Sequence, residues 1–330
     1  MANIAVLGAG SCGTALALQL ARNQHDVTLW AHRREHAAAL GEARENRRYL
    51  PGIPLPPNLA ISDDLAASVR AAELVLAVVP SRAFAGLLAD LKPHIQQTPL
   101  MWAIKGFEAG SGRLLTDVFM ETLGEHPHAI LAGPSFAKEV AAGQPTAVTI
   151  AARDDALAQT FARYFHGSNF LCYTSTDLTG IQIGGAVKNV IAIATGIADG
   201  LGCGANARAA LVTRGLREIT RLATALGAQE ETLTGLAGMG DLVLTCTDDQ
   251  SRNRRFGLAL GRGESAAAAK AAIGQVVEGE GATHDTYALA QQHGIHMPIT
   301  EHLHHMLAGS RSLEDTFASL LARNIKQERH

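Results

Sequence analysis

The chain has few cysteines, and no two of them form a close pair. Its 330 residues include four, at positions 12, 172, 203 and 246. None has the Cys-x-x-Cys spacing of redox pairs and zinc sites, so the sequence predicts neither a disulfide framework nor a bound metal. Scattered thiols of this kind fit a reducing cytoplasm.

The chain also has almost no excess of positive or negative charge. The formal net charge at pH 7 is −3, and charged residues make up 18% of the chain. A protein with this balance is not built to bind nucleic acid or an anionic membrane surface, so its basic side chains must act locally. The N-terminus lacks the basic segment of a secretory signal. We therefore expect a cytoplasmic protein whose partners are small molecules.

The N-terminus does contain a glycine motif between a strand and a helix. Residues 4–7 are apolar, the sequence GAGSCG follows, and a helical period begins at Thr14. In such a turn Gly8 permits the tight bend, Gly10 lets a pyrophosphate approach the backbone, and Gly13 lets the helix pack closely on the strand. The free N–H groups at the start of the helix then face the phosphates. This order of elements predicts a bound dinucleotide rather than an ordinary strand–helix turn.

Two arginines follow the second predicted strand. Residues 27–30 form that strand, and the sequence AHRR comes directly after it. NAD-specific folds place an acidic residue here for the ribose 2′-hydroxyl, but Asp26 lies at the wrong end of the strand. Arg33 and Arg34 suit the 2′-phosphate of NADP instead. We predict NADP or NAD as the cofactor, with NADPH favoured; a solvated basic turn is the alternative.

Strands and helices alternate as far as residue 177. After a proline-rich crossover at residues 49–57, apolar runs separated by helical segments lie at residues 59–61, 73–80, 100–104, 128–131, 147–151 and 170–173. This alternation predicts an α/β domain with a doubly wound, Rossmann-like parallel sheet, which binds ligands at the carboxyl ends of its strands. A chain of 330 residues is long for one core. We assign residues 1–177 to this dinucleotide-binding domain.

From residue 178 onward the pattern is helical only. The predicted helices cover residues 181–198, 206–226, 253–260, 283–292, 300–308 and 313–325, and a flexible loop is predicted at residues 235–240. Residues 178–330 are therefore expected to form an all-helical substrate-binding and catalytic domain. The histidines at positions 302, 304 and 305 have no acidic partner at metal-site spacing, and they indicate a solvated helix face.

Lys188 lies in the middle of the most apolar helix. The apolar residues 181–198 are interrupted by the strongly polar side chains of Gln182, Lys188 and Asn189, which favour a buried core helix over a membrane span. A buried lysine has a lowered pKa, which brings it into the range of a general acid or base. The alternative is a lysine that extends along the helix to solvent. The mid-helix position favours the functional interpretation.

Other candidates for chemistry follow strands or precede helices. Lys105 ends a strand at the expected ligand edge, and Gly133 and Ser135 form a turn whose N–H groups could face an anion, although Ser135 could equally be a plain helix cap. Asp241 follows the glycine-rich loop, where it could also be a turn carboxylate. The sequence SRNRR at residues 251–255 concentrates guanidinium groups that suit phosphate; a solvated turn is its alternative.

These motifs together resemble the bacterial NAD(P)-dependent glycerol-3-phosphate dehydrogenases. The matching stretches, in the family's order, are GAGSCGTALA, YLPGIPLP, AIKGFE, GPSFAKEV, KNVIAIATGIADGL with NARAALVTRGL, GLAGMGDLVLTC, SRNRRFG and QVVEG. The resemblance implies an oxidoreductase that interconverts dihydroxyacetone phosphate and sn-glycerol 3-phosphate and supplies the latter for glycerophospholipids. It implies no metal and no stable membrane insertion, and it leaves a homodimer open.

The resemblance also implies roles for individual residues. Lys188 matches the proton donor and acceptor, and Lys105, by its like charge, would help lower the pKa of Lys188. The positions that match substrate contacts are Lys105, Gly133, Ser135, Lys188, Asp241, Ser251, Arg252 and Asn253. With the three motif glycines, the cofactor positions are Gly8, Gly10, Ser11, Cys12, Gly13, His32, Arg33, Tyr49, Lys105, Ala137, Arg252, Val276 and Glu278. Cys12 stands where the family usually has tryptophan, so we expect it to contact the cofactor through its backbone.

Two rival interpretations remain at this stage. A related β-hydroxyacid dehydrogenase would share the architecture and a catalytic lysine, but would act on a carboxylate. A non-catalytic NADP-binding protein would bind the cofactor without turnover, against which the set Lys105, Lys188, Asp241 and Arg252 argues.

Overall fold

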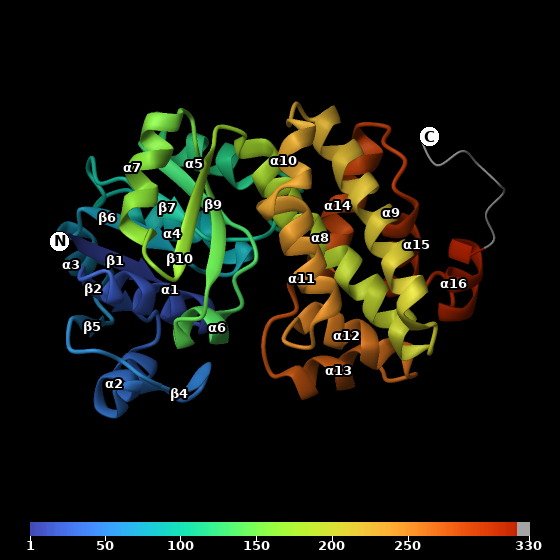
Figure 1. The fold of residues 1–330 in the computed structure, drawn as a ribbon, viewed down its shortest axis with the longest axis horizontal. Coiled ribbons are helices and arrows are strands. Elements are labelled where there is room, and N and C mark those ends of the chain that lie inside the picture. The colour runs from blue at the N-terminus through green and yellow to red at the C-terminus, as the bar shows by residue number, and fades with distance from the viewer. Residues whose placement is uncertain (322–330) are drawn as a thin grey trace.

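A computed structural model describes residues 1–321, in which a sheet part and a helical part lie side by side (Figure 1). The sheet has eight strands in the order β10-β9-β8-β7-β6-β1-β2-β5. Six of them run parallel, as the sequence predicts: β1 (Asn3–Leu7), β2 (Asp26–Trp30), β5 (Leu59–Ser62), β6 (Leu74–Ala77), β7 (Leu100–Trp102) and β8 (His128–Ala132). The predicted strands and their order along the chain are confirmed.

Helices cover both faces of the sheet, which explains why its central strands β6, β7 and β8 are buried throughout. The helices on one face include α1 (Ser11–Arg22) and α7 (Asp155–Phe165), and those on the other include α3 (Leu65–Arg70), α4 (Phe84–Leu91) and α5 (Leu115–Leu123). Alternate side chains of β1 enter the two cores, with Ile4 and Val6 in the first and Ala5 and Leu7 in the second. A doubly covered parallel sheet buries both sides of its central strands, while the edge strands β5 and β10 stay partly exposed.

The last two strands differ from the prediction of a parallel sheet. β9 (Thr146–Ala152) pairs antiparallel with β8, and β10 (Phe170–Ser175) runs parallel to β9. Only a six-residue helix, α6 (Ala137–Ala142), lies between β8 and β9. Because such a helix is only about 9 Å long, it cannot carry the chain back along the sheet. β9 therefore starts at the edge where β8 ends.

A small hairpin follows α2 (Arg34–Ala43), in place of the predicted simple crossover. β3 (Glu45–Asn46) pairs antiparallel with β4 (Leu50–Pro54). The buried Asn46 amide donates hydrogen bonds to the Ala9 carbonyl at 3.1 Å and to Thr14 Oγ1 at 2.7 Å. The hairpin is thereby fixed to the glycine loop.

The helical part is built around α8 (Leu178–Gly200), of which residues 180–198 are all buried. By length and composition α8 could cross a membrane, but its apolar window lies entirely inside the protein. This confirms the predicted core helix. The helices that complete this part are α9 (Gly204–Ala225), α10 (Glu230–Thr234), α11 (Asp241–Thr247), α12 (Arg252–Gly261), α13 (Ala266–Ile273), α14 (Glu278–Gln292), α15 (Pro298–Leu307) and α16 (Leu313–Leu321). The end of the helix predicted at 313–325 lies outside the described residues.

Two predictions in the helical part are wrong. The segment predicted as a flexible loop is a π-helical turn, η2 (Leu236–Gly240), which runs directly into α11. The turn is tightly packed, since a Cβ at Gly238 would lie 2.1 Å from the Leu233 carbonyl oxygen. The histidines of α15 are half-buried rather than solvated, because the His304 ring stacks on Tyr287 with centroids 4.2 Å apart. No metal-binding cluster occurs within residues 1–321.

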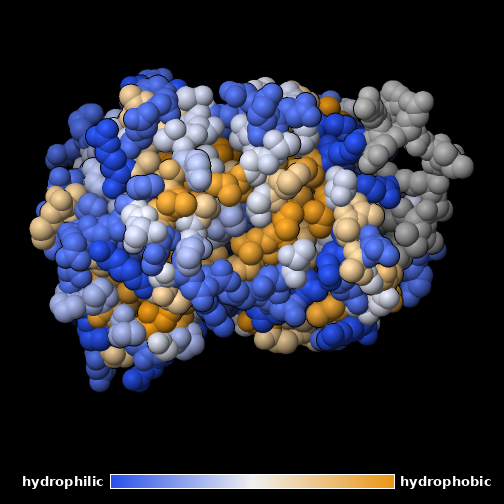
Figure 2. Space-filling model, in the orientation of Figure 1, coloured by the Kyte–Doolittle hydropathy of each residue, from blue (hydrophilic) through white to orange (hydrophobic). Residues whose placement is uncertain are grey.

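The visible surface is mainly hydrophilic, but an apolar band crosses the helical part over α9 and α11 (Figure 2). Met239 of η2 and Val243 of α11 are exposed large apolar side chains of the helical part. The end of the helical part that faces the sheet carries the residues considered next.

Candidate active site

A hollow of about 550 Å³ lies where the carboxyl ends of β1 and β2 meet the helical part. The sheet part contributes the glycine loop and the segment after β2, and the helical part contributes the starts of α12 and α14. The predicted cofactor residues that line it are Gly8, Gly10, Ser11, Cys12, Gly13, His32, Arg33, Tyr49, Arg252, Val276 and Glu278. Lys105 and Ala137 are not among its lining residues.

The glycine loop has the geometry that a dinucleotide requires. Gly8 has φ +123°, and a Cβ on it would lie 2.3 Å from the Val78 carbonyl oxygen. A Cβ at Gly13 would lie 1.8 Å from the Gly8 carbonyl oxygen, whereas Gly10 has no neighbour within 4 Å. Closed space at the first and third glycines with open space at the second matches a tight turn, close helix packing and an approach for pyrophosphate. The residues present therefore fit the cofactor.

Two lysines and one aspartate meet between the sheet edge and the helical part. Lys188 Nζ on α8 donates to Asp241 Oδ1 at 2.5 Å and to Thr245 Oγ1 at 2.8 Å. Lys105 Nζ, beyond the end of β7, donates to Asp241 Oδ2 at 2.6 Å and to the Gly133 carbonyl at 2.9 Å. Asp241 is thus held between two ammonium groups, and the structure brings together four of the predicted substrate residues.

Burial and neighbouring charges set the protonation of this cluster. Burial and the Lys105 charge lower the pKa of Lys188, the Asp241 charge opposes them, and the net pKa is about 8. Burial alone would raise the pKa of Asp241, but the two ammonium groups outweigh it and hold that pKa below its ordinary value. The lysine is therefore able to give and take a proton near neutral pH, while the aspartate stays ionised. The predicted lowering of the Lys188 pKa and the part played in it by Lys105 agree with this geometry.

The start of α12 is tied to the neighbourhood of Lys188. Asn253 Nδ2 donates to Asn189 Oδ1 at 2.8 Å, and Asn253 Oδ1 accepts from the Gly279 backbone N–H at 2.9 Å. Ser251 caps the helix by accepting from the Arg254 N–H at 3.2 Å. Arg252, between these two buried residues, lines the dinucleotide hollow.

The turn after β8 excludes one of the two roles that the sequence allows for Ser135, that of a helix cap. α6 begins at Ala137, so the cap position belongs to Phe136 and Ser135 is not a helix cap. Ser135 Oγ instead donates to the Gly133 carbonyl at 3.1 Å, the same oxygen that accepts from Lys105. Ser135 thus lies beside the lysine–aspartate cluster.

Two residues at the site were missed by the sequence analysis. Thr245 contacts Lys188 because it lies four residues after Asp241 on α11, one helical turn on; the spacing was visible, but the segment was predicted as a loop leading to an apolar run. Ser81, four residues beyond the end of β6, donates at 3.2 Å to Glu278, which lines the hollow from the helical part. Nothing in a lone serine near a strand end indicates that contact.

Comparisons with known proteins identify the family. Residues 3–158 match the family model described as the NAD-dependent glycerol-3-phosphate dehydrogenase N-terminus, and residues 177–318 match that of its C-terminus. The chain is 52% identical to the glycerol-3-phosphate dehydrogenase [NAD(P)+] of Pseudoalteromonas translucida over 98% of both chains. It is 52% identical to that of Pectobacterium carotovorum subsp. carotovorum over 99% of this chain and 97% of the relative.

A solved structure agrees with these relatives. The crystal structure of glycerol-3-phosphate dehydrogenase from Coxiella burnetii is 47% identical to this chain, superposes with a TM-score of 0.95, and covers 98% of this chain and 99% of its own. This agreement extends over both the sheet part and the helical part. The chain belongs to the NAD(P)-dependent glycerol-3-phosphate dehydrogenases, the oxidoreductases that interconvert dihydroxyacetone phosphate and glycerol 3-phosphate.

Proposed function

We propose that Lys188 is the proton donor and acceptor of this reaction. The observation that carries the proposal is its hydrogen bonding: an ammonium group has three N–H donors, and Asp241 and Thr245 accept two of them. The third is left for a substrate oxygen. Two fixed partners also hold Nζ in one position, which is what a proton-transferring group requires.

The chemistry follows from the chain's own groups. A bound nicotinamide cofactor supplies the hydride that reaches C2 of dihydroxyacetone phosphate. Lys188, as ammonium, donates a hydrogen bond to the C2 carbonyl oxygen and then transfers its proton to that oxygen as the alcohol forms. In the reverse direction neutral Lys188 takes the proton from the hydroxyl. Asp241 stays ionised throughout and stabilises the charged lysine.

Substrate phosphate is assigned to the start of α12. Arg252 presents a guanidinium group at this position, and Ser251 and Asn253 flank it. A planar guanidinium binds phosphate with paired hydrogen bonds. We place Lys105, Gly133, Ser135 and Asp241 around the reacting end of the substrate, because they surround Lys188 Nζ or its partner.

The cofactor is assigned to the hollow beside this cluster, with NADPH favoured over NADH. Arg33 supports that preference, because it lines the hollow at the carboxyl end of β2 and no acidic residue takes its place there. Cys12 is exposed and lines the same hollow. We assign it, with Ala137 at the start of α6, to backbone contacts with the cofactor.

We further propose the wider setting of the enzyme. Residues 1–177 would form the cofactor domain and residues 178–330 the substrate domain, since the last strand ends at Ser175 and α8 begins at Leu178. A cytoplasmic enzyme of this activity supplies glycerol 3-phosphate for glycerophospholipids. A homodimer stays a prediction. Light scattering tests it by measuring the mass of the protein in solution.

Replacing Lys188 by methionine tests the proposed role, because it keeps the apolar stem and removes the proton. General acid–base assistance is worth about 10²–10⁴-fold, so NADPH oxidation with dihydroxyacetone phosphate should slow by at least about 10²-fold. NADPH affinity, measured by fluorescence titration, should change little. The exposed Lys92 provides the matched control, and Lys92→Met should leave both quantities unchanged. A folded Lys188→Met enzyme with near-normal turnover would eliminate Lys188 as the proton carrier.

A further inference from the structure

The arginines after β2 and in the turn between β3 and β4 have different partners. Arg33 lines the cofactor hollow and also a groove along α2, and Arg47 and Arg48 line that groove. Arg34 lies 3.7 Å from the Asp63 carboxylate, and Arg47 lies 3.4 Å from Glu45. Within residues 1–321, no carboxylate lies within ion-pair distance of Arg33 or Arg48. The two arginines without an acidic partner are therefore those that remain able to bind an external anion.

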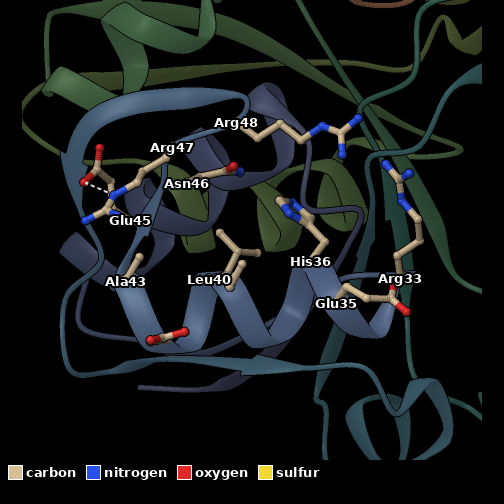
Figure 3. A pocket seen from close by; sticks show the side chains of 11 residues that line it. Arg33, Glu35, His36, Leu40, Ala43, Glu45, Asn46, Arg47 and Arg48 are labelled. Carbon is tan, nitrogen blue, oxygen red and sulfur yellow. Dashed lines mark hydrogen bonds and ion pairs between the residues drawn. The ribbon is translucent and has the colours of Figure 1, made fainter.

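A single tyrosine brings these two arginines together. Arg33 Nη2 donates to the Tyr49 hydroxyl at 3.3 Å, while the Arg48 guanidinium lies over the Tyr49 ring, 5.2 Å from its centroid. Figure 3 shows both side chains extending to the same end of a groove along α2, whereas Arg47 points to the other end, toward Glu45. Two like charges that meet without a carboxylate between them repel each other and attract an anion.

The turn that carries Arg48 is fixed by the glycine loop. Asn46 accepts from the Tyr49 N–H at 3.2 Å through the side chain that also donates to the Ala9 carbonyl. The His36 ring lies edge-on to Tyr49 with centroids 5.3 Å apart, and its Nε2 is 3.1 Å from that same carbonyl oxygen. Arg48 is thus placed relative to the cofactor loop and not merely relative to solvent.

We propose that Arg48 is the second cationic ligand, with Arg33, for the 2′-phosphate of NADP, and that Arg34 is not. The inference rests on the proposed cofactor preference and adds a residue that lies 15 positions after Arg33 in the sequence. A phosphate monoester held between two guanidinium groups neutralises their repulsion and receives charge-assisted hydrogen bonds from both sides. NADH has no group to place there, so Arg48 would contribute to NADPH binding alone.

Binding of two nucleotides that lack the nicotinamide tests the inference without turnover. Calorimetry would compare 2′,5′-ADP with 5′-ADP for the native enzyme and for Arg48→Gln. Since tenfold corresponds to about 1.4 kcal/mol and charge-assisted hydrogen bonds reach this value, Arg48→Gln should weaken 2′,5′-ADP by about tenfold and leave 5′-ADP unchanged within about twofold. Added salt should reduce this difference, because the side chain is exposed.

Arg47→Gln is the matched control, because it removes the same charge from the same turn. Arg47→Gln and Arg34→Gln, each made as a single variant, should leave the preference for 2′,5′-ADP intact. In an Arg33→Gln/Arg48→Gln double variant the losses should be non-additive, since both side chains contact one phosphate.

The outcomes separate the two proposals. If the native enzyme does not prefer 2′,5′-ADP, the proposed NADPH preference fails and the role of Arg48 fails with it. If the native enzyme prefers 2′,5′-ADP but Arg48→Gln keeps that preference, only the role of Arg48 is overturned. If Arg48→Gln weakened the binding of 2′,5′-ADP and 5′-ADP equally, Arg48 would contact the adenosine instead of the 2′-phosphate. If Arg47→Gln weakened 2′,5′-ADP as much as Arg48→Gln does, the effect would come from the general positive charge of the turn. Either result contradicts the inference.

Discussion

Burial and two neighbouring charges set the pKa of Lys188, and each acts in a known direction. Burial and the Lys105 charge lower the pKa of its ammonium group, and Asp241 raises it. The result, about 8, lies close enough to neutrality for the group to carry a proton in either direction. A lysine left at its ordinary pKa would release its proton far less readily.

The pH dependence of the reaction should therefore differ in its two directions. Ketone reduction needs protonated Lys188, so kcat/KM should be constant at low pH and fall as pH rises through about 8. Alcohol oxidation needs the neutral form, so kcat/KM should rise with pH up to about 8 and then level off. Initial rates measured in both directions across this range check the prediction.

Asp241→Asn provides the control for that profile. The carboxylate raises the pKa of Lys188, so its loss should move both breaks to lower pH. It should also lower the rate, because the lysine loses a charged partner at 2.5 Å. Breaks that stay in place, or that move upward, would mean that another group controls the profile.

At this scale the sequence predicted the residues better than their contacts. Lys188 stands out because a charge inside an apolar helix needs a reason, and Asp241 and Arg252 stand in recognisable motifs. Thr245 and Ser81 do not stand out, since each gains its role only when α11 and β6 are placed beside their partners. Arg48 was passed over because Arg34 is nearer in sequence to Arg33, although Arg34 lies beside Asp63.

The crossing of α8 and α12 holds Lys188 and Arg252 at a fixed separation. Four glycines make the contact. On α8, a Cβ added at Gly196 would lie 2.2 Å from the Arg254 carbonyl oxygen, and a Cβ added at Gly200 would lie 2.5 Å from the Leu258 carbonyl oxygen. On α12, a Cβ at Gly257 or Gly261 would lie 2.1 or 2.4 Å from a carbonyl oxygen of α8. The backbones therefore touch, and any side chain at these positions must push the helices apart.

Gly257→Ala should thus damage both stability and activity. Overpacking of this kind costs about 1–3 kcal/mol, and the displaced start of α12 should raise KM for dihydroxyacetone phosphate. Gly41→Ala is the control, because Gly41 lies in α2 with open space around its Cα. That change should stabilise the protein by up to about 1 kcal/mol and leave KM unchanged. Urea unfolding measures the change in stability, and steady-state kinetics measure the change in KM. A Gly257→Ala enzyme with unchanged stability and KM would contradict the close contact between α8 and α12.

Helices and strands were predicted correctly where a run of neighbouring residues indicates them. They were missed where contacts between residues distant in the sequence decide the structure. The long apolar segment of α8 and the short apolar run of β6 can be read directly from the sequence. The hairpin of β3 and β4 is too short to show a period, and β3 has two residues. Residues 235–240 were predicted as a flexible loop because the three glycines at positions 235, 238 and 240 usually interrupt helices. Packing of Gly238 against Leu233 overrides that preference here.

For the whole molecule, the sequence indicated two parts but not the change of strand direction within the sheet part. β9 and β10 reverse direction because the short α6 cannot span the sheet, a constraint of length that the alternation of strands and helices does not reveal. The reversal makes β10 the outer strand at one edge of the sheet, and the chain passes from its end at Ser175 to α8 at Leu178. The substrate cluster and the cofactor hollow form along this junction.

Because the hollow takes residues from both parts, cofactor binding should stabilise both of them together. Gly10 and Arg33 line it from the sheet part, and Lys270 and Val276 line it from the helical part. At a free NADPH concentration of 100 times Kd the stabilisation is about 2.7 kcal/mol, which a rise in Tm would report. Hydrogen exchange should show slower exchange at the glycine loop and also at residues 274–278.

Ser81→Ala separates this effect from contacts that the protein already makes across the hollow. It removes the hydrogen bond to Glu278, so it should lower Tm in the absence of cofactor, while the NADPH-induced rise should persist. A ligand that binds the native state stabilises it whatever that state's starting stability, because the shift depends on ligand concentration and Kd. If NADPH slowed exchange only at the glycine loop, the residues of α12 and α14 would lie outside the cofactor site. The assignment of Arg252, Val276 and Glu278 to the cofactor would then have to be abandoned.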